Sequence, residues 1–478
     1  MLKNISYRIF ITVFILISLH ATPDGSLSFR YTDTVRSLVD FGTFALQKGY
    51  RSHVDILLLN NNSYSVIPPG IPILLAPLYW LHRTFMSLVG ISVNSEIYWS
   101  IFNILTNIFV LAPLVSVVAV IMFKTLNKFT DNIYKQLWLV FIFIFGSLVF
   151  FYSTYGIWTH VYTMSFIFIA FYLTLTRRNS FLIGLFLGLA QIVDYIAIIP
   201  ISLLIGFWIH TKIQDQQIQY QGRIFLKELI VLLMGYSIFL LGLIYYNYII
   251  TGSVFKTPNS LFFQQLNKQN PESFDLVYRR SMNEGMFNFP SFQVLFGLTF
   301  SPFRGIFLYF PMVFLFIISL FRKNFKKNNV MVFCFIFVAF IFTFNSTYYA
   351  WSGDVCFGPR HLVVAIPFII IGTVYTPLKY IKILGALSIF INLAGVSTVP
   401  SNNLFLNIVM FLYKGPFLHW LDYLYKVVLP KYYNIHISLM TPFFIYVVTA
   451  WIIYLIWRPI IKAQKDLDKK GWVRLNEH

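Results

Sequence analysis

Long apolar segments recur along this sequence and limit its fold more than any other feature. Residues 101–123, 229–250 and 437–456 are mostly apolar, and each has the roughly 18 residues or more that an α-helix needs to cross a bilayer. Charged residues make up only 11% of the chain, whereas roughly a quarter is typical of soluble proteins. A transmembrane β-barrel would instead alternate in polarity over segments of about ten residues. The sequence therefore predicts an all-α polytopic membrane protein.

We expect about twelve transmembrane helices in one integral-membrane unit that covers residues 1–478. Neither a fixed-period repeat nor a low-complexity linker divides the sequence. We expect the first apolar segment to be kept as a helix, because no small-x-small cleavage site follows it. The expected spans are 7–21, 98–123, 136–153, 157–177, 181–193, 195–209, 228–250, 304–321, 329–346, 361–378, 383–398 and 436–457.

The net charge of +19 follows from membrane topology and does not indicate nucleic-acid binding. With a cytoplasmic N-terminus, 22 of the 36 Lys and Arg residues fall in cytoplasmic segments, including a basic tail at 458–478. This distribution is the positive-inside pattern of multi-pass proteins. We therefore expect a cell-membrane protein whose partners include membrane lipids and no nucleic acid.

Two long segments are expected on the non-cytoplasmic face, at 22–97 and 251–303. Long loops on a rigid scaffold often carry function. The first contains an amphipathic apolar stripe over 35–46, which favours a helix lying along the membrane surface. Pro68, Pro69 and Gly70 break the chain next, and 71–91 is expected to form a second juxtamembrane or re-entrant helix.

The scarce polar residues near the expected outer face suggest a site that binds a phosphate. Arg304 and Arg360 lie beside Pro and Gly at the mouths of spans, and His361 follows Arg360. A guanidinium can grip two phosphate oxygens at once. Alternatively, both arginines extend to lipid headgroups, as cations at helix ends commonly do. These three residues are our candidates for holding a phosphate.

Further polar residues are candidates for the same pocket, each with an ordinary structural alternative. Asp194 lies between two short apolar segments; it is either functional at membrane depth or solvated at a hairpin turn. Asp354 either pairs with Arg360 or contacts an acceptor. His160 either faces the cavity or belongs to an interfacial aromatic belt. The remaining pocket candidates are Tyr64, Pro69 and Gly70.

Several motifs, taken in order, resemble those of one enzyme superfamily. They are "PDGSLSFRY" with "SLVDFGTFAL", "YSVIPPGIPILLAPLY", "GSVFKTP", "LTFSPFRGIFLYFPM" and "WSGDVCFGPRHLVVAIPF". Together they resemble bacterial integral-membrane glycosyltransferases of the C superfamily (GT-C), in the branch related to protein O-mannosyltransferases and lipid A aminoarabinose transferases.

The resemblance implies a hexosyl- or pentosyltransferase with a GT-C-like fold. Such an enzyme moves a sugar from a polyprenyl-phosphate donor to a lipid, glycan or protein acceptor, with inversion, on the non-cytoplasmic face. It also implies an Asp base just beyond the first helix, which matches Asp24 here. Asp33 is the rival, because this chain lacks the acidic doublet that many relatives carry.

Two other function classes remain open. A transporter or flippase would show paired, inverted halves with broken helices and charges at the midplane, and the polar motifs here gather on one face. A polysaccharide polymerase or ligase would use the same lipid-linked sugars but concentrate its chemistry in a later loop. We expect no organic cofactor, and the two cysteines show no metal-ligand spacing; a divalent metal requirement stays open.

Overall fold

The apolar segments fold into helices whose ends are set mainly by Pro, Gly, Asn and Ser. The computed structural model describes residues 2–23, 28–47, 49–51, 55–214, 222–269, 288–353, 356–398, 403–436 and 442–469. A first helix, α1 (Leu2–Leu19), leads into an insert of two helices and three short strands. These are α2 (Phe29–Phe41), β1 (Ala45–Leu46), β2 (Ile56–Leu59), β3 (Asn62–Ser65) and α3 (Gly70–Leu88).

The middle of the chain is a series of apolar helices. It comprises α4 (Glu96–Thr106), η2 (Asn107–Leu111), α5 (Ala112–Leu126), α6 (Ile133–Phe145), α7 (Leu148–Thr154), α8 (Thr159–Leu175), α9 (Ser180–Val193), η3 (Tyr195–Ala197), α10 (Ile198–Gln214), α11 (Gly222–Thr251) and α12 (Pro258–Gln269).

The last third repeats this pattern with shorter helices. Its elements are α14 (Phe292–Thr299), α15 (Ile306–Tyr309), α16 (Met312–Leu320), α17 (Lys323–Lys326), α18 (Asn329–Thr347), η4 (Arg360–Ala365), α19 (Ile366–Gly372), η5 (Thr373–Tyr375), α20 (Leu378–Val396), α21 (Leu404–Lys414), α22 (His419–Tyr423), η6 (Leu424–Val428), α23 (Leu429–Tyr433) and α24 (Phe443–Lys469).

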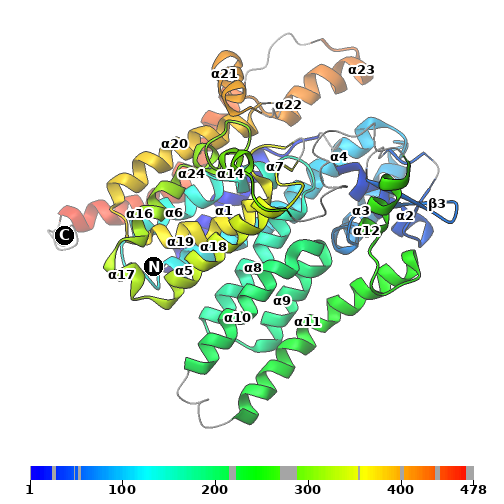
Figure 1. Ribbon diagram of the computed structural model, residues 1–478. Coiled ribbons are helices and arrows are strands. Elements are labelled where there is room, and N and C mark those ends of the chain that lie inside the picture. Colours follow the sequence, from blue (N-terminus) through cyan, green and yellow to red (C-terminus); the bar gives the residue numbers. More distant parts are fainter. Residues whose placement is uncertain are drawn as a thin grey trace.

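In space the elements form three groups (Figure 1). One bundle contains α1, α5, α6, α16, α19 and α20, and both chain ends shown in the figure lie beside it. A second group, α8 to α11, extends away from that bundle. The third group, α2, α3, α4 and the small sheet, lies at the opposite end from the chain termini, with α12 packed against β2.

The described residues include six helical stretches that are long and apolar enough to cross a membrane, or up to eight if each of two bent pairs is one span. The chain is therefore a membrane-embedded, predominantly α-helical protein. The six are Glu96–Leu126, Tyr195–Gln214, Gly222–Thr251, Asn329–Thr347, Leu378–Val396 and Phe443–Ile460. They match six of the twelve predicted spans, and a bent pair, Ile133–Phe145 with Leu148–Thr154, matches a seventh.

The other five predicted spans are shorter or broken. Four of them, at 7–21, 157–177, 181–193 and 361–378, correspond to apolar helices of 10–17 residues. The fifth, 304–321, is divided into α15 and α16 at Phe310, which leaves the helical region with φ −143°. Pro311 explains this break, because proline disfavours helical backbone in the residue before it. The second bent pair, Leu404–Lys414 with His419–Tyr433, lies in a stretch predicted to be extramembrane. The count of twelve stays a prediction.

Several hydrogen bonds join connecting segments or helix ends that are far apart in the sequence. In each case, the two partners were predicted to lie on the same side of the membrane. On the predicted cytoplasmic side, the contacts are Lys135 Nζ to the Val374 carbonyl (3.2 Å), Asn328 Nδ2 to Tyr375 Oη (3.4 Å) and Asn329 Nδ2 to Gln214 Oε1 (3.0 Å). On the other side, they include Ile157 N to Ser28 Oγ (2.7 Å) and Trp420 Nε1 to the Leu19 carbonyl (2.9 Å).

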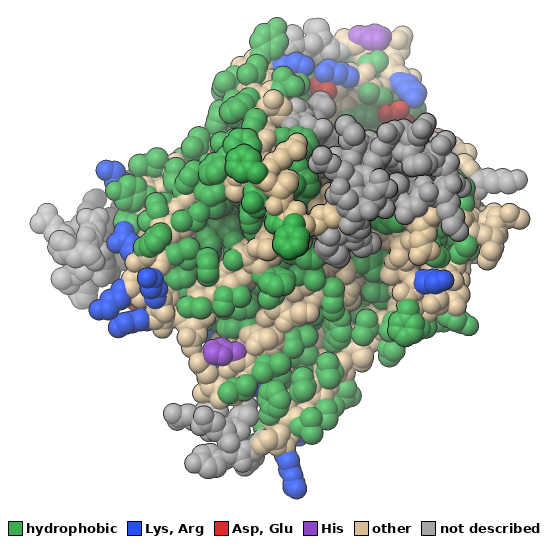
Figure 2. Space-filling view, in the orientation of Figure 1, with side chains coloured by type: hydrophobic (Ala, Val, Ile, Leu, Met, Phe, Trp, Pro, Cys, Tyr) green, Lys and Arg blue, Asp and Glu red, His purple; other side chains and the backbone are tan. Residues whose placement is uncertain are grey.

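The molecular surface agrees with this arrangement. Figure 2 shows hydrophobic side chains across the middle of one face, with Lys and Arg side chains at its margins, one group of them over α17. Four of the cations around α17 are exposed, Arg322, Lys323, Lys326 and Lys327.

The small antiparallel sheet was not predicted from the sequence. Its strand order is β1-β3-β2, and β2 and β3 are joined by a turn at Asn60 and Asn61. Both asparagines have positive φ, 50° and 61°, as the central residues of a type I′ hairpin turn require. The Asn-Asn pair beside an apolar run was a sign of this hairpin in the sequence.

Helices α9 and α11 approach each other closely because glycines lie at their contact. A Cβ on Gly184 would lie 1.9 Å from the Leu232 carbonyl oxygen, and a Cβ on Gly235 would lie 2.2 Å from that of Phe181. Small residues at such positions allow membrane helices to pack backbone to backbone. This contact fixes the helix that leads to Asp194.

We expect Gly184→Leu and Gly235→Leu to separate α9 from α11 and to destabilise the folded protein by about 1–3 kcal/mol or more, as overpacking does. Thermal unfolding in detergent measures the effect. Gly206→Leu is the matched control, because a Cβ on the exposed Gly206 meets no atom within 4 Å. Equal unfolding midpoints for all three variants would contradict this packing.

Candidate functional site

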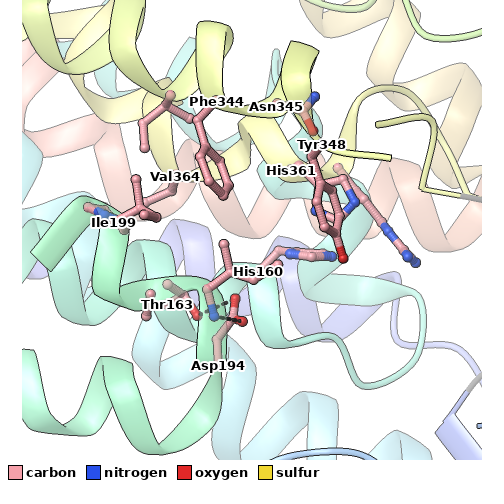
Figure 3. A pocket seen from close by; sticks show the side chains of 14 residues that line it. His160, Thr163, Asp194, Ile199, Phe344, Asn345, Tyr348, His361 and Val364 are labelled. Carbon is pink, nitrogen blue, oxygen red and sulfur yellow. Dashed lines mark hydrogen bonds between the residues drawn. The ribbon is translucent and has the colours of Figure 1, made fainter. Parts of the chain in front are cut away.

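A partly open cavity lies among α8, the break between α9 and α10, α18 and η4 (Figure 3). Its polar lining comes from His160, Thr163, Asp194, Asn345, Tyr348, Arg360 and His361. Its apolar lining comes from Ile196, Ala197, Ile199, Pro200, Ile341, Phe344 and Val364. Figure 3 shows Ile199, Val364 and Phe344 toward one end and His160, His361 and Tyr348 toward the other. The cavity is therefore amphipathic along its length.

Asp194 reaches this cavity because α9 ends immediately before it. Its backbone is extended, with φ −152°, and its Oδ1 accepts a hydrogen bond from the Ile196 amide over 3.0 Å. Thr163 Oγ1 donates to Oδ2 over 3.4 Å. The side chain thus caps the following turn and presents a carboxylate to the cavity.

Gly70 helps to hold this break in place, although it lines no described cavity. A Cβ at position 70 would lie 2.5 Å from the carbonyl oxygen of Ile192, two residues before Asp194. Only glycine allows the start of α3 to lie against the end of α9 in this way. Pro69 is the residue before α3, and Tyr64 lies on β3 opposite Ala45 and Leu57. Of these three predicted pocket residues, Gly70 therefore supports the break before Asp194, and none of the three lines a described cavity.

Arg360 and His361 enter the cavity from the start of η4. Gly353, with φ 71°, lies against the arginine, and a Cβ there would be 2.7 Å from Arg360 Nε. The guanidinium lies 5.5 Å from the centre of the Trp158 ring. Arg360 Nε and His361 Nε2 have no hydrogen-bond partner among the described residues. These two nitrogen atoms are buried, although their residues are half-buried, so the pair offers unsatisfied polar atoms to a ligand.

Aromatic rings, two histidines and one carboxylate surround Arg360. The rings of His160 and His361 meet edge to face at 5.3 Å, and Tyr348 meets His361 at 5.7 Å. The Asp194 carboxylate lies near enough to Arg360 for electrostatic attraction. An arginine, a carboxylate and neutral ring nitrogens around one cavity can bind an anion and accept a proton.

Helix α2 adds a second polar layer beside the cavity. Tyr31 hydrogen-bonds Thr159 and interacts electrostatically with Asp194 and Arg360. Burial raises the pKa of the Tyr31 phenol, so its hydroxyl stays protonated. Arg30 forms an ion pair with Asp55.

Arg304, the third predicted phosphate ligand, lies near His361 but outside the lining of the cavity. It is fully buried, its Nε donates to the Ser352 carbonyl, and its Nη1 donates to the Phe303 carbonyl over 2.7 Å. It lines neither described cavity. This environment favours a structural role, in which the guanidinium satisfies backbone carbonyls of two loops.

Of the two residues predicted as the catalytic base, the structure describes only Asp33. Asp24 lies outside the described residues, as does Asp354. Asp33 is buried and pairs with Arg51: the Arg51 amide donates to Asp33 Oδ2 over 2.8 Å, and Nη2 lies 3.1 Å from Oδ1. Arg51 Nη2 also donates to Thr32 Oγ1 over 2.6 Å. An acid engaged in this way is well placed to hold the loop and poorly placed to accept a proton.

Sequence reasoning identified Asp194, Arg360 and His361, and it left His160 open; all four line one cavity. It missed Thr163, Asn345, Tyr348 and Tyr31. The aromatic residues carried no signal in a chain with 19% Phe, Trp and Tyr. Thr163 is four residues after Thr159, so helical spacing offered a hint that both face the same side. No group of three or more His, Cys, Asp or Glu side chains that would hold a metal ion occurs in the described part of the chain.

Comparison with known proteins adds no relative: no family model, curated protein or solved structure matches this chain.

We expect Asp33 and Arg51 to stabilise the protein as a pair, with a coupling free energy of about 0.5–3 kcal/mol. A double-mutant cycle of Asp33→Asn, Arg51→Gln and the double variant, followed by thermal unfolding, measures this coupling. The single variants are expected to lose stability because each leaves a largely buried charge without its partner. Additive effects in the double variant would exclude the pairing role of Asp33.

Proposed function

We propose that this protein is a membrane glycosyltransferase that moves a sugar from a polyprenyl-phosphate donor to an acceptor on the non-cytoplasmic face of the cell membrane. The observation that carries the proposal is the amphipathic cavity, which has Arg360, His160 and His361 at one end and aliphatic side chains of α10 and α18 at the other. A lipid phosphate has the same division between a charged head and an apolar chain. The ordered motifs shared with GT-C glycosyltransferases, and a GT-C-like architecture of about twelve spans, belong to the same proposal.

The size of the cavity agrees with a phosphate ligand. Its volume is about 70 Å³, and a water molecule needs roughly 10–15 Å³ of such space. It therefore accepts a few water-sized groups, such as a phosphate, and leaves a complete sugar outside. The lipid chain would extend between α10 and α18 past Ile199 and Ile341.

In the proposed reaction, an acceptor hydroxyl oxygen attacks the anomeric carbon as the bond from that carbon to the phosphate oxygen breaks. The electron pair of that bond leaves with the lipid phosphate, and a carboxylate takes the hydroxyl proton. Arg360 stabilises the charge that accumulates on the phosphate oxygens. Asp24 is the proposed base, on the resemblance alone, and Asp194 is the described carboxylate beside Arg360.

We expect Arg360→Ala and Asp24→Asn to abolish transfer while membrane insertion is kept. Arg360→Lys should restore only part of the activity, because lysine keeps the charge but not the planar fork. Loss of a general base costs about 10²- to 10⁴-fold. Mass spectrometry of lipid-linked sugars and cell-surface glycans, with and without the gene, identifies the product, and each variant is then expressed in the deletion strain.

Lys431→Ala is the matched control for this experiment, since Lys431 is an exposed cation away from the cavity. Unchanged glycans and lipid-linked sugars on deletion of the gene would overturn the proposed function. Full activity of both site variants would overturn the site and leave the enzyme class standing.

We expect the first loop and α17 to lie on opposite sides of the membrane, with the first loop outside. In a chain with Cys334→Ser and Cys356→Ser, an impermeant maleimide should label Asn62→Cys in intact cells. It should label Lys327→Cys only after permeabilisation. Both positions are exposed, so accessibility does not limit the reaction. The reverse pattern would put the proposed site on the cytoplasmic face.

A further inference from the structure

A second cavity lies between the segment after α1, the start of α4 and α22. Its volume is about 350 Å³, within the roughly 300–1,000 Å³ of small-molecule sites. Pro23, Arg51, Trp99 and Tyr423 contribute to its wall. Segments far apart in the sequence thus line a half-open space large enough for a sugar unit.

Arg51 is held rigidly at this cavity. Its guanidinium lies 3.8 Å from the centre of the Trp99 ring and 4.5 Å from that of Phe29, so it is stacked against both aromatic side chains. Asp33 balances its charge. Because Nε and Nη2 already donate to Asp33 and Thr32, the arginine presents its Nη1 group in a fixed position without contributing a free positive charge.

The remaining polar groups at the cavity supply both donors and acceptors. Asn94 and Glu96 are exposed at the start of α4, and Ser95 lies between them. Asn103 is buried, its Nδ2 donates to the Pro23 carbonyl over 3.2 Å, and its Oδ1 has no partner among the described residues. Amides, hydroxyls and a carboxylate together match the mixed donor and acceptor character of sugar hydroxyl groups.

The charge balance of the cavity disfavours an anionic ligand. Arg51 is neutralised by Asp33, and Glu96 forms no ion pair within the described part of the chain. Among the described residues, the wall therefore carries a net negative charge, which would repel an anion but not a neutral polyol.

We propose that this second cavity binds a neutral sugar unit through Asn94, Glu96 and the stacked Arg51. Its use as the glycan acceptor site rests on the proposed glycosyltransferase function, but binding of the sugar does not. Phe29 and Tyr31 support that use. Side chains that are two residues apart on a helix point in nearly opposite directions. Helix α2 therefore presents Phe29 to this cavity and Tyr31 toward Arg360 and Asp194.

The test is direct binding of neutral sugars to the purified full-length protein in detergent. Isothermal titration with glucose, N-acetylglucosamine and their disaccharides should give saturable binding that persists when salt rises from about 0.1 M to about 1 M, because no free charge pair is screened. Asn94→Ala and Glu96→Gln should each weaken it about tenfold or more, since buried polar groups of the complex lose their partners. Asn62→Ala, an exposed asparagine on β3, should bind like the unaltered protein.

Saturable sugar binding that both variants weaken supports the inference, even where deletion of the gene leaves all glycans unchanged and the proposed transferase function fails. Three results would overturn it: no saturable binding of any sugar below about 10 mM, sugar binding that inorganic phosphate displaces, or undiminished affinity in both variants. Any of these, combined with loss of transfer in Arg360→Ala, would leave the transferase function intact.

Discussion

Helices that end in an apolar environment leave carbonyl groups without partners, and pairing those groups determines how this molecule is assembled. Side chains from distant segments supply several of the donors. The Trp420 indole donates to the carbonyl of Leu19 at the end of α1, and Asn392 donates to that of Tyr309 at the end of α15. Further pairs are Tyr152 with Phe357, Tyr246 with Ile67, Asn103 with Pro23 and Thr22 with Thr154. Leu19, Tyr309 and Thr154 end helices, whereas Phe357, Ile67 and Pro23 lie in connecting segments. These bonds therefore tie helix ends and connecting segments to distant parts of the chain.

The proposed site is a consequence of these breaks. Asp194 occupies the interruption between α9 and α10 and bonds the Ile196 amide that the interruption leaves free. Arg360 opens a 3₁₀ turn, η4, after a loop that contains Gly353 and Gly358. A continuous helix at either point would have directed these side chains along its own surface. The same irregular backbone that needs hydrogen-bond partners therefore concentrates polar side chains in one cavity.

The sequence was informative where a residue's role depends on its neighbours in the chain. Asp194, Arg360 and His361 stood out because each is a polar group at the end of an apolar segment, and the predicted topology placed those ends on one side. Arg304 carries the same local signature, with Pro and Gly beside it, yet it bonds a carbonyl 48 residues away, on Ser352. The local sequence pattern cannot distinguish an arginine that lines the cavity from one that bonds backbone carbonyls, because tertiary packing determines the arginine's hydrogen-bond partner.

The breaks in the helices were harder to predict than the helices themselves. Hydropathy identifies an apolar segment but not whether it continues as one helix, so α15 and α16 were expected as a single span in spite of Pro311. The sheet was missed for a related reason. Leu57 and Tyr64 lie in a segment without strict alternation, and the positive φ values of Asn60 and Asn61 are what turn that segment into a hairpin.

The arginines near the proposed site differ in what an anionic ligand would gain from them. Three of them already have partners: Asp55 for Arg30, Asp33 for Arg51, and two backbone carbonyls for Arg304. Binding an anion at these three would compete with interactions that the folded protein already makes. Arg360 is held by a ring and a glycine, and within the described residues it forms no ion pair. Among the described residues, an incoming phosphate would therefore displace no ion-pair partner of Arg360, which makes this residue the most favourable of the four arginines as an anchor for the proposed donor.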